Sequence, residues 1–233
     1  MKLTYLLINV FTIAIPLAFS FHKKLQFHRT WIAFWPATLF TAAIFIIWDI
    51  IFTNLGIWGF NRDYLTGIQL LNLPLEEWLF FICIPYAIVF TYAALKKIVR
   101  VDYFQGQAKS LNWVLSLLLF ALASTHTNQL YTAVTFFATA LFLLWHIFYL
   151  QADYMKGFYL SYLLIFLGPF LIVNGILTGS FIDEPVVWYN NSENFSIRVL
   201  TIPIEDFVYG FLLYLMNVTL YESYLSKQKG ESL

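Results

Sequence analysis

The sequence predicts an all-α membrane protein in which seven transmembrane helices form two parallel three-helix repeats plus one linking helix. The first observation is composition, because the 233 residues are 61% hydrophobic and only 11% charged, whereas soluble domains carry about 25% charged residues. The second is the recurrence of apolar runs close to the roughly 20 residues that a transmembrane helix needs. The third is an acidic motif that occurs twice, each time at the start of an apolar run.

Seven apolar segments have the composition expected of membrane spans, and the fourth is the shortest. The first begins almost at the N-terminus and lacks a basic lead, so we interpret it as a retained helix rather than a cleaved signal peptide. The predicted spans are Leu3–Ser20, Trp31–Phe52, Leu75–Leu95, Leu111–Ala123, Leu130–Leu150, Phe158–Thr178 and Ile204–Leu225.

The basic residues support this number of spans. Seven spans place ten basic residues on one side of the membrane and three on the other, which is a clear positive-inside bias. We therefore expect an integral membrane protein with its N-terminus outside and its C-terminus in the cytoplasm. The ten are Lys23, Lys24, Arg29, Lys96, Lys97, Arg100, Lys109, Lys156, Lys227 and Lys229, and the three are Lys2, Arg62 and Arg198.

The acidic motif reveals an internal repeat. The segment PLEEWLF at Pro74–Phe80 matches PIEDFVY at Pro203–Tyr209 position by position in residue type. An odd number of spans between the two copies makes them parallel and puts both motifs on the outer side at one depth. We therefore divide the chain into a first repeat (1–96), a linker with the extra helix (97–128), a second repeat (129–225) and a polar tail (226–233).

Each motif carries two adjacent carboxylates, in the pairs Glu76–Glu77 and Glu205–Asp206. One interpretation is that they cap the helix N-termini, where negative charge complements the helix dipole, and remain solvated. However, one carboxylate suffices as a cap, and consecutive helix positions point about 100° apart. One acid of each pair can therefore face the bundle while its neighbour faces the loop or water, which indicates a functional role.

Further polar and aromatic residues are expected near the two motifs. Asp49 and Asn174 lie near the outer ends of the second and sixth spans, where polar side chains usually face the bundle interior; for Asn174, a hydrogen bond between helices is an equal alternative. Trp58, Trp78 and Trp188 belong either to an interfacial aromatic belt or to rings that stabilise a carbocation. Burial and like-charge repulsion favour the neutral form of a carboxyl group, and such an acid among ring faces suits proton-initiated chemistry on an alkene.

These residues resemble a known family, the flavin-independent lycopene cyclases. The resemblance is carried by PLEEWLFF and PIEDFVYG, by the segments NGILT at Asn174–Thr178 and WYN at Trp188–Asn190, and by the tandem seven-span layout. It covers roughly Leu3 to Leu225 and is closest to the fused form of the two-subunit bacterial, archaeal and fungal enzymes.

The resemblance implies a membrane-bound lycopene β-cyclase, with a bacterial plasma membrane as the expected location. It implies lycopene or a related linear carotenoid as substrate, entering sideways from the lipid, with membrane lipid and other carotenoid-pathway enzymes as partners. The end group is protonated, closes to a six-membered ring and loses a proton. Glu76, Glu77, Glu205 and Asp206 become the acid/base candidates, with Glu76 and Glu205 preferred as the same residue type in both copies. Asp49 and Asn174 would orient the acid, and Trp58, Trp78 and Trp188 would line the substrate.

No cofactor or metal is expected. The sequence has no Gly-x-Gly-x-x-Gly segment after a strand for a dinucleotide. The lone Cys83 cannot build a thiolate metal site, and zero net charge gives no indication of nucleic acid binding. A retinal protein would need a lysine within Ile204–Leu225, and that span has none.

Some alternatives remain open. A cyclase of longer, C50 carotenoids or a carotenoid hydratase would use similar residues, and a membrane prenyltransferase is a weaker alternative because its magnesium-binding aspartate motifs are missing. A proton-coupled transporter with its site between the repeats is the alternative outside enzymes. The sequence does not decide the ring type, the number of ends cyclised, or whether the motifs share one site.

Overall fold

A computed structural model describes residues 2–99, 104, 106–150 and 154–230. Arg100 of the charge count, the linker residues 100–103 and 105, and the tail residues 231–233 therefore lie outside the described residues. The α-helices are α1 (Thr4–Phe19), α2 (Trp31–Asn54), α3 (Leu75–Ile98), α4 (Ala108–Thr125), α5 (Leu130–Trp145), α6 (Met155–Ile165), α7 (Leu171–Leu177) and α8 (Ile204–Lys229).

Short elements join or extend these helices. The π turn η3 (His146–Leu150) continues α5, and the π turn η4 (Phe166–Phe170) joins α6 to α7 in one rod. Pro169 lies inside η4, where its missing N–H disrupts the regular helical hydrogen bonds. The remaining elements are η1 (Phe27–Thr30), η2 (Arg62–Tyr64), η5 (Asn191–Glu193), β1 (Trp58–Phe60), β2 (Gln69–Leu70), β3 (Leu73–Pro74), β4 (Val187–Tyr189), β5 (Arg198–Val199) and β6 (Ile202–Pro203).

The predicted spans fall on helices, and several of these helices suit a membrane. In the described part, five helical stretches are long and apolar enough to cross a bilayer: Phe27–Asn54, Leu75–Ile98, Ala108–Thr125, Leu130–Leu150 and Gly157–Leu177. Helix α1 is apolar but has 16 residues, and α8 carries acidic residues in its first turn. The chain is therefore a helical protein with membrane-type helices, and the total of seven spans stays a prediction.

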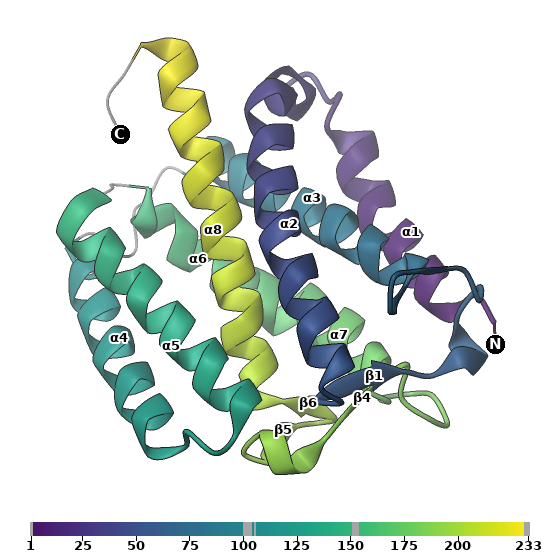
Figure 1. The fold of residues 1–233 in the computed structure, drawn as a ribbon. Helices are drawn as coiled ribbons and strands as arrows, with labels where there is room; N and C mark the ends of the chain where they lie inside the picture. Colours follow the sequence, from purple (N-terminus) through teal and green to yellow (C-terminus); the bar gives the residue numbers. More distant parts are fainter. Residues whose placement is uncertain (1, 100–103, 105, 151–153, 231–233) are drawn as a thin grey trace.

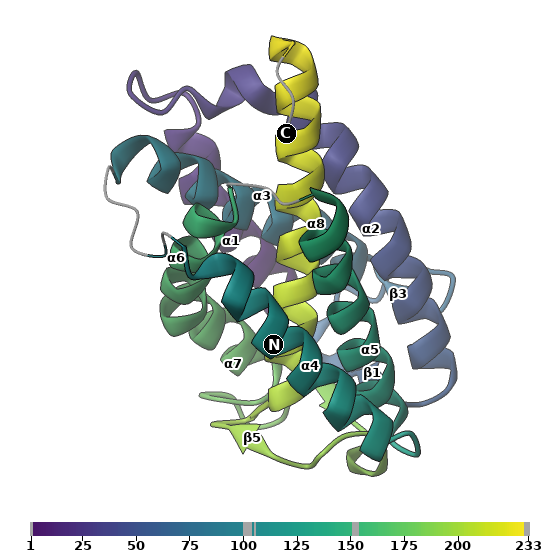
Figure 2. The ribbon, with the colours of Figure 1, turned by 90° about the vertical axis from the view of Figure 1, so that its left-hand side faces the viewer.

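Helix α8 runs through the centre of the bundle, where it packs against α2, α3, α5 and α6 (Figures 1 and 2). Helix α4 lies outside and packs mainly on α5. Large rings fill the interior, and Phe34, Tyr86 and Tyr214 are fully buried. The outer surface is apolar as well, since Ile32 and Leu167 are 71% and 74% exposed. An apolar exterior of this kind fits lipid rather than water.

The loops that precede α3 and α8 have the same construction, 129 residues apart. In each loop a three-residue strand is followed by a 3₁₀ turn and then by a hairpin whose two strands have two residues each. The hairpin is β2–β3 in the first loop and β5–β6 in the second. Each hairpin places a leucine in the left-handed region, with φ of 58° at both Leu71 and Leu200. Such a conformation is uncommon for leucine, so its recurrence shows that the two loops share one backbone design.

Strands β1 and β4 connect these two loops in an antiparallel ribbon, in which Gly59 lies opposite Trp188. These two residues are 129 positions apart and therefore equivalent, so the ribbon is centred on a local two-fold axis. A Cβ atom on Gly59 would collide with the indole ring of Trp188, which explains the glycine. The ribbon closes the end of the bundle opposite the C-terminus of α8 (Figure 1).

Candidate active site

All four motif carboxylates lie in the first turn of α3 or α8, directly after the prolines that precede these helices. Their exposed fractions are 0% for Glu76, 7% for Glu77, 0% for Glu205 and 5% for Asp206. The interpretation as solvated helix caps therefore does not hold, because all four side chains are buried. The two acids of each pair nevertheless have different surroundings.

The first acid of each pair holds the loop that precedes its helix. Glu76 Oε1 accepts a hydrogen bond from the backbone N–H of Thr66 at 2.6 Å. Glu205 Oε1 accepts one from the backbone N–H of Phe195 at 2.8 Å, and another from Thr132 Oγ1 at 2.7 Å. Neither acid lines the cavity described below. Glu76 and Glu205 were preferred as acid/base candidates because they are the same residue type in both copies. In the structure, both accept a hydrogen bond from the backbone of the preceding loop.

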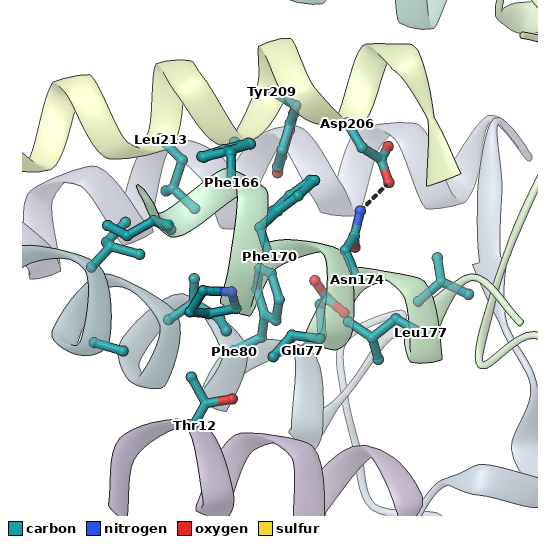
Figure 3. A pocket seen from close by; sticks show the side chains of 18 of the residues that line it. Thr12, Glu77, Phe80, Phe166, Phe170, Asn174, Leu177, Asp206, Tyr209 and Leu213 are labelled. Atoms are coloured by element: carbon teal, nitrogen blue, oxygen red, sulfur yellow. Dashed lines mark hydrogen bonds between the residues drawn. The ribbon is translucent and has the colours of Figure 1, made fainter. Parts of the chain in front are cut away.

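The second acid of each pair faces an internal cavity of about 390 Å³. Glu77 Oε2 accepts a hydrogen bond from the Tyr5 hydroxyl at 2.6 Å. In Figure 3, Asn174 on α7 reaches towards Asp206 on α8, and Glu77 on α3 is drawn on the side of Asn174 away from α8. The structure thus brings one carboxylate from each motif to one shared space.

Asp206 accepts three hydrogen bonds. Tyr131 donates to Oδ1 at 2.5 Å, while Asn174 Nδ2 and the Tyr189 hydroxyl donate to Oδ2 at 2.7 and 2.9 Å. Desolvation, followed by the nearby charge of Asp206, raises the pKa of the Tyr189 phenol well above its ordinary value. The phenol therefore keeps its proton and serves as a donor.

Asp49 is a third carboxyl group on the cavity. It is buried, and its Oδ1 accepts a hydrogen bond from Trp58 Nε1 at 2.5 Å, while Oδ2 has no partner within the described residues. Trp58 itself lines the cavity and stands 5.1 Å from the Tyr131 ring, measured between ring centroids. Asp49, Asn174 and Trp58 are therefore gathered around the same space as Glu77 and Asp206.

Two of the predicted tryptophans lie elsewhere. Trp78 directs Nε1 to the carbonyl oxygen of Leu70 in the first hairpin, at 3.3 Å. Trp188 is 44% exposed and covers Gly59 on the ribbon. Neither lines the cavity. Their position suits the interfacial aromatic belt that was the alternative interpretation.

The sequence reasoning missed the tyrosines that hold the carboxylates. Tyr5 and Tyr131 occupy the first turns of α1 and α5, and each donates to the second acid of its own repeat. A signal was present, because TYLLI at Thr4–Ile8 and LYTAV at Leu130–Val134 place a tyrosine at the same point of both first helices.

Apart from Thr12, Thr91 and the hydroxyl of Tyr209, the rest of the cavity is apolar. Figure 3 shows rings of α3, η4 and α8 around it, with Phe166 and Phe170 stacked at 4.2 Å between ring centroids. Within the described residues, no group of three or more histidine, cysteine or acidic side chains is placed to hold a metal ion. The site therefore combines three carboxyl groups at one end with a hydrocarbon-like wall.

Comparison with known proteins places this arrangement in a family. The family model described as lycopene cyclase matches residues 2–95 and 128–224, and thus most of the chain. The chain belongs to the lycopene cyclase family. The resemblance seen in the acidic motifs is therefore confirmed.

A fungal relative supports the same family. The bifunctional lycopene cyclase/phytoene synthase of Arthroderma gypseum is 29% identical over 163 residues, which cover 70% of this chain and 25% of the relative. The chain thus spans about a quarter of the length of that relative. No solved structure matches the chain.

Proposed function

We propose that the chain is a lycopene β-cyclase, which closes the linear end groups of lycopene into β-ionone rings with no net redox change. The main support for this proposal is that Glu77 and Asp206, one from each acidic motif, line the same apolar cavity. The proposal includes the seven-span arrangement of two parallel repeats, because it brings both motifs to one end of the bundle. In this reaction class the protein supplies a proton, a base and a dry site.

The composition of the cavity wall favours a carboxyl group that keeps its proton. Asp49, Glu77 and Asp206 line the cavity, and no lysine, arginine or histidine of the described chain does. An uncompensated buried charge costs several kcal/mol, so three ionised carboxylates in this space would be strongly disfavoured. A neutral carboxyl group next to an alkene is the proton donor that cyclisation needs.

We assign the acid to Glu77 and the base to Asp206. Asp206 accepts three hydrogen bonds, whereas Glu77 accepts one, from Tyr5. Hydrogen bonds to an ionised acceptor are roughly twice as strong as neutral ones, so the three donors favour the carboxylate form of Asp206. Asp49 stands beside the donor as a second carboxyl group.

The reaction then balances in protons and electrons. Glu77 adds its proton to the terminal double bond, which leaves a tertiary carbocation. The π electrons of the neighbouring double bond form the new carbon–carbon bond, so that the cation moves into the six-membered ring. Asp206 removes a proton from the adjacent ring carbon, and the C–H electrons become the ring double bond. Transfer of this proton back to Glu77 restores the starting state.

Aromatic faces are available for the cationic intermediate. Trp58, Tyr131 and Tyr209 all line the cavity, and the rings of Trp58 and Tyr209 are 6.2 Å apart. A cation over an aromatic face is stabilised by about 0.5–2 kcal/mol, with the larger value at desolvated sites. These rings are better placed for this role than Trp78 or Trp188.

Pigment analysis in bacterial cells that accumulate lycopene tests the proposal. The wild-type chain is expected to yield cyclised carotenoid, whereas Glu77→Gln and Asp206→Asn are expected to lose cyclisation by about 10²–10⁴-fold. Asp63→Asn is the matched control, because Asp63 is an exposed carboxylate in the loop before α3. Unchanged lycopene with the wild-type chain, or full activity of both variants, would contradict the proposal.

A further inference from the structure

A second hollow opens on the side of the bundle, between α1 and the rod formed by η4 and α7. Its volume is about 940 Å³, and its lining is apolar apart from Lys2, Thr4 and Thr12. We call this hollow the α1–α7 groove. Leu7 on α1 and Ile172 on α7 both line it and are 47% and 60% exposed.

The α1–α7 groove is continuous with the site. Phe11, Thr12, Ile15, Pro169 and Val173 line both the groove and the cavity that holds the carboxylates. Figure 3 shows Thr12 on α1 at the side of the cavity away from α8. An apolar path therefore leads from the outer surface, between two helices, to Glu77 and Asp206.

The local sequence explains why the path is open. Helix α1 packs mainly on α3 and only lightly on α7. The π turn η4 contains Gly168 and Pro169, and the space that a Cβ atom on Gly168 would occupy has no neighbour within 4 Å. A break in regular helix geometry beside a small residue thus leaves a gap that the neighbouring helix does not fill.

We propose that the α1–α7 groove binds the unreacted chain of a long linear polyene while the cavity holds one of its end groups. This inference rests on the proposed function. A cavity of about 390 Å³ is near the small end of ligand sites, which run from about 300 to 1,000 Å³, so a long carotenoid needs room beyond it. The groove offers the chemistry of a hydrocarbon chain, because its walls present almost no hydrogen-bonding groups.

Photo-crosslinking in lipid nanodiscs tests the groove separately from catalysis. The probe is a linear polyene with a diazirine at the end opposite its reactive end group, and the adducts are mapped by mass spectrometry. Adducts are expected on Leu7, Ile172 and Ile176, and excess lycopene should displace the probe from them. A diazirine-labelled phospholipid is the control, because it labels every lipid-facing surface, including Leu117 on α4, without competition by lycopene.

Two variants and one matched control complete the test. Leu7→Trp and Ile172→Trp fill the groove outside the cavity, and each is expected to weaken polyene binding about tenfold, which corresponds to about 1.4 kcal/mol. Leu117→Trp, at a residue that is 62% exposed on α4, is expected to bind as the wild type does. Circular dichroism confirms that each variant is folded.

The outcomes separate the two proposals. Competed adducts in the groove without any cyclised product would support the groove and contradict the proposed reaction. Cyclised product with adducts no denser in the groove than on α4, or with unchanged binding in both groove variants, would overturn the groove.

Discussion

Replacing Tyr131 by phenylalanine tests how Asp206 is held. Tyr131 is the donor that the described structure gives to Oδ1, whereas Oδ2 accepts from both Asn174 and Tyr189. A hydrogen bond to a charged group contributes about 1.5–3 kcal/mol, so Tyr131→Phe should slow cyclisation roughly 10- to 150-fold. Tyr189→Phe leaves Oδ2 with one donor and should have a smaller effect.

Steady-state kinetics with lycopene in nanodiscs measures this difference. We expect kcat to fall while KM stays near the wild-type value, because the tyrosine hydroxyl supports the base and not the hydrocarbon. Tyr221→Phe is the matched control, since Tyr221 is a buried tyrosine of α8 whose hydroxyl bonds to Thr30 at 3.1 Å. The reasoning is refuted if Tyr189→Phe is the more damaging variant, or if Tyr131→Phe retains the wild-type kcat.

Further predictions concern packing and stability. Gly210→Ala places a Cβ atom 2.9 Å from the Phe166 ring and should lower activity in a folded protein. Gly157→Ala, whose Cβ atom would make an ordinary contact with the Tyr92 ring at 3.8 Å, should keep wild-type activity in the same assay. Glu222→Gln removes the ion pair with Lys96, whose atoms are 2.6 Å apart, and should lower stability by about 1–2 kcal/mol in thermal unfolding, with activity per folded molecule unchanged.

The helices were predictable because long apolar runs leave few alternatives for a chain in lipid. The start of α3 and of α8 was predictable from the prolines Pro74 and Pro203, which end the preceding hairpins. The polar tail begins at Ser226, and helix α8 extends into it as far as Lys229. Polar composition alone does not end a helix that packing has already nucleated.

The sequence predicted only in part which carboxylates come together at the site. Helix geometry implies that two adjacent acids face different surroundings, but it does not say which acid of each pair faces inward. That choice depends on the loops before α3 and α8, in which the backbone N–H groups of Thr66 and Phe195 bind Glu76 and Glu205. Glu77 and Asp206 are thereby left to face the cavity. These hydrogen bonds depend on the conformation of the loops, and the sequence of such short strands and turns does not predict that conformation.

The tryptophans illustrate the same limit. Trp58 and Trp188 are both on the β1–β4 ribbon, yet only Trp58 lines the cavity. Side chains alternate between the two faces of a strand, and the strand register that decides their direction comes from pairing between segments far apart in the chain. The motif alone could therefore name the rings but not the direction in which each one points.

The most direct test of the account is a single turnover in deuterated water. Enzyme in nanodiscs is equilibrated in D₂O, mixed with less than one equivalent of lycopene, and the product is analysed by mass spectrometry. Proton-initiated closure by an exchangeable carboxyl group predicts that the wild type incorporates one deuterium for each ring formed. The inactive Glu77→Gln variant is expected to give no deuterated ring. Rings that form without deuterium would contradict the account.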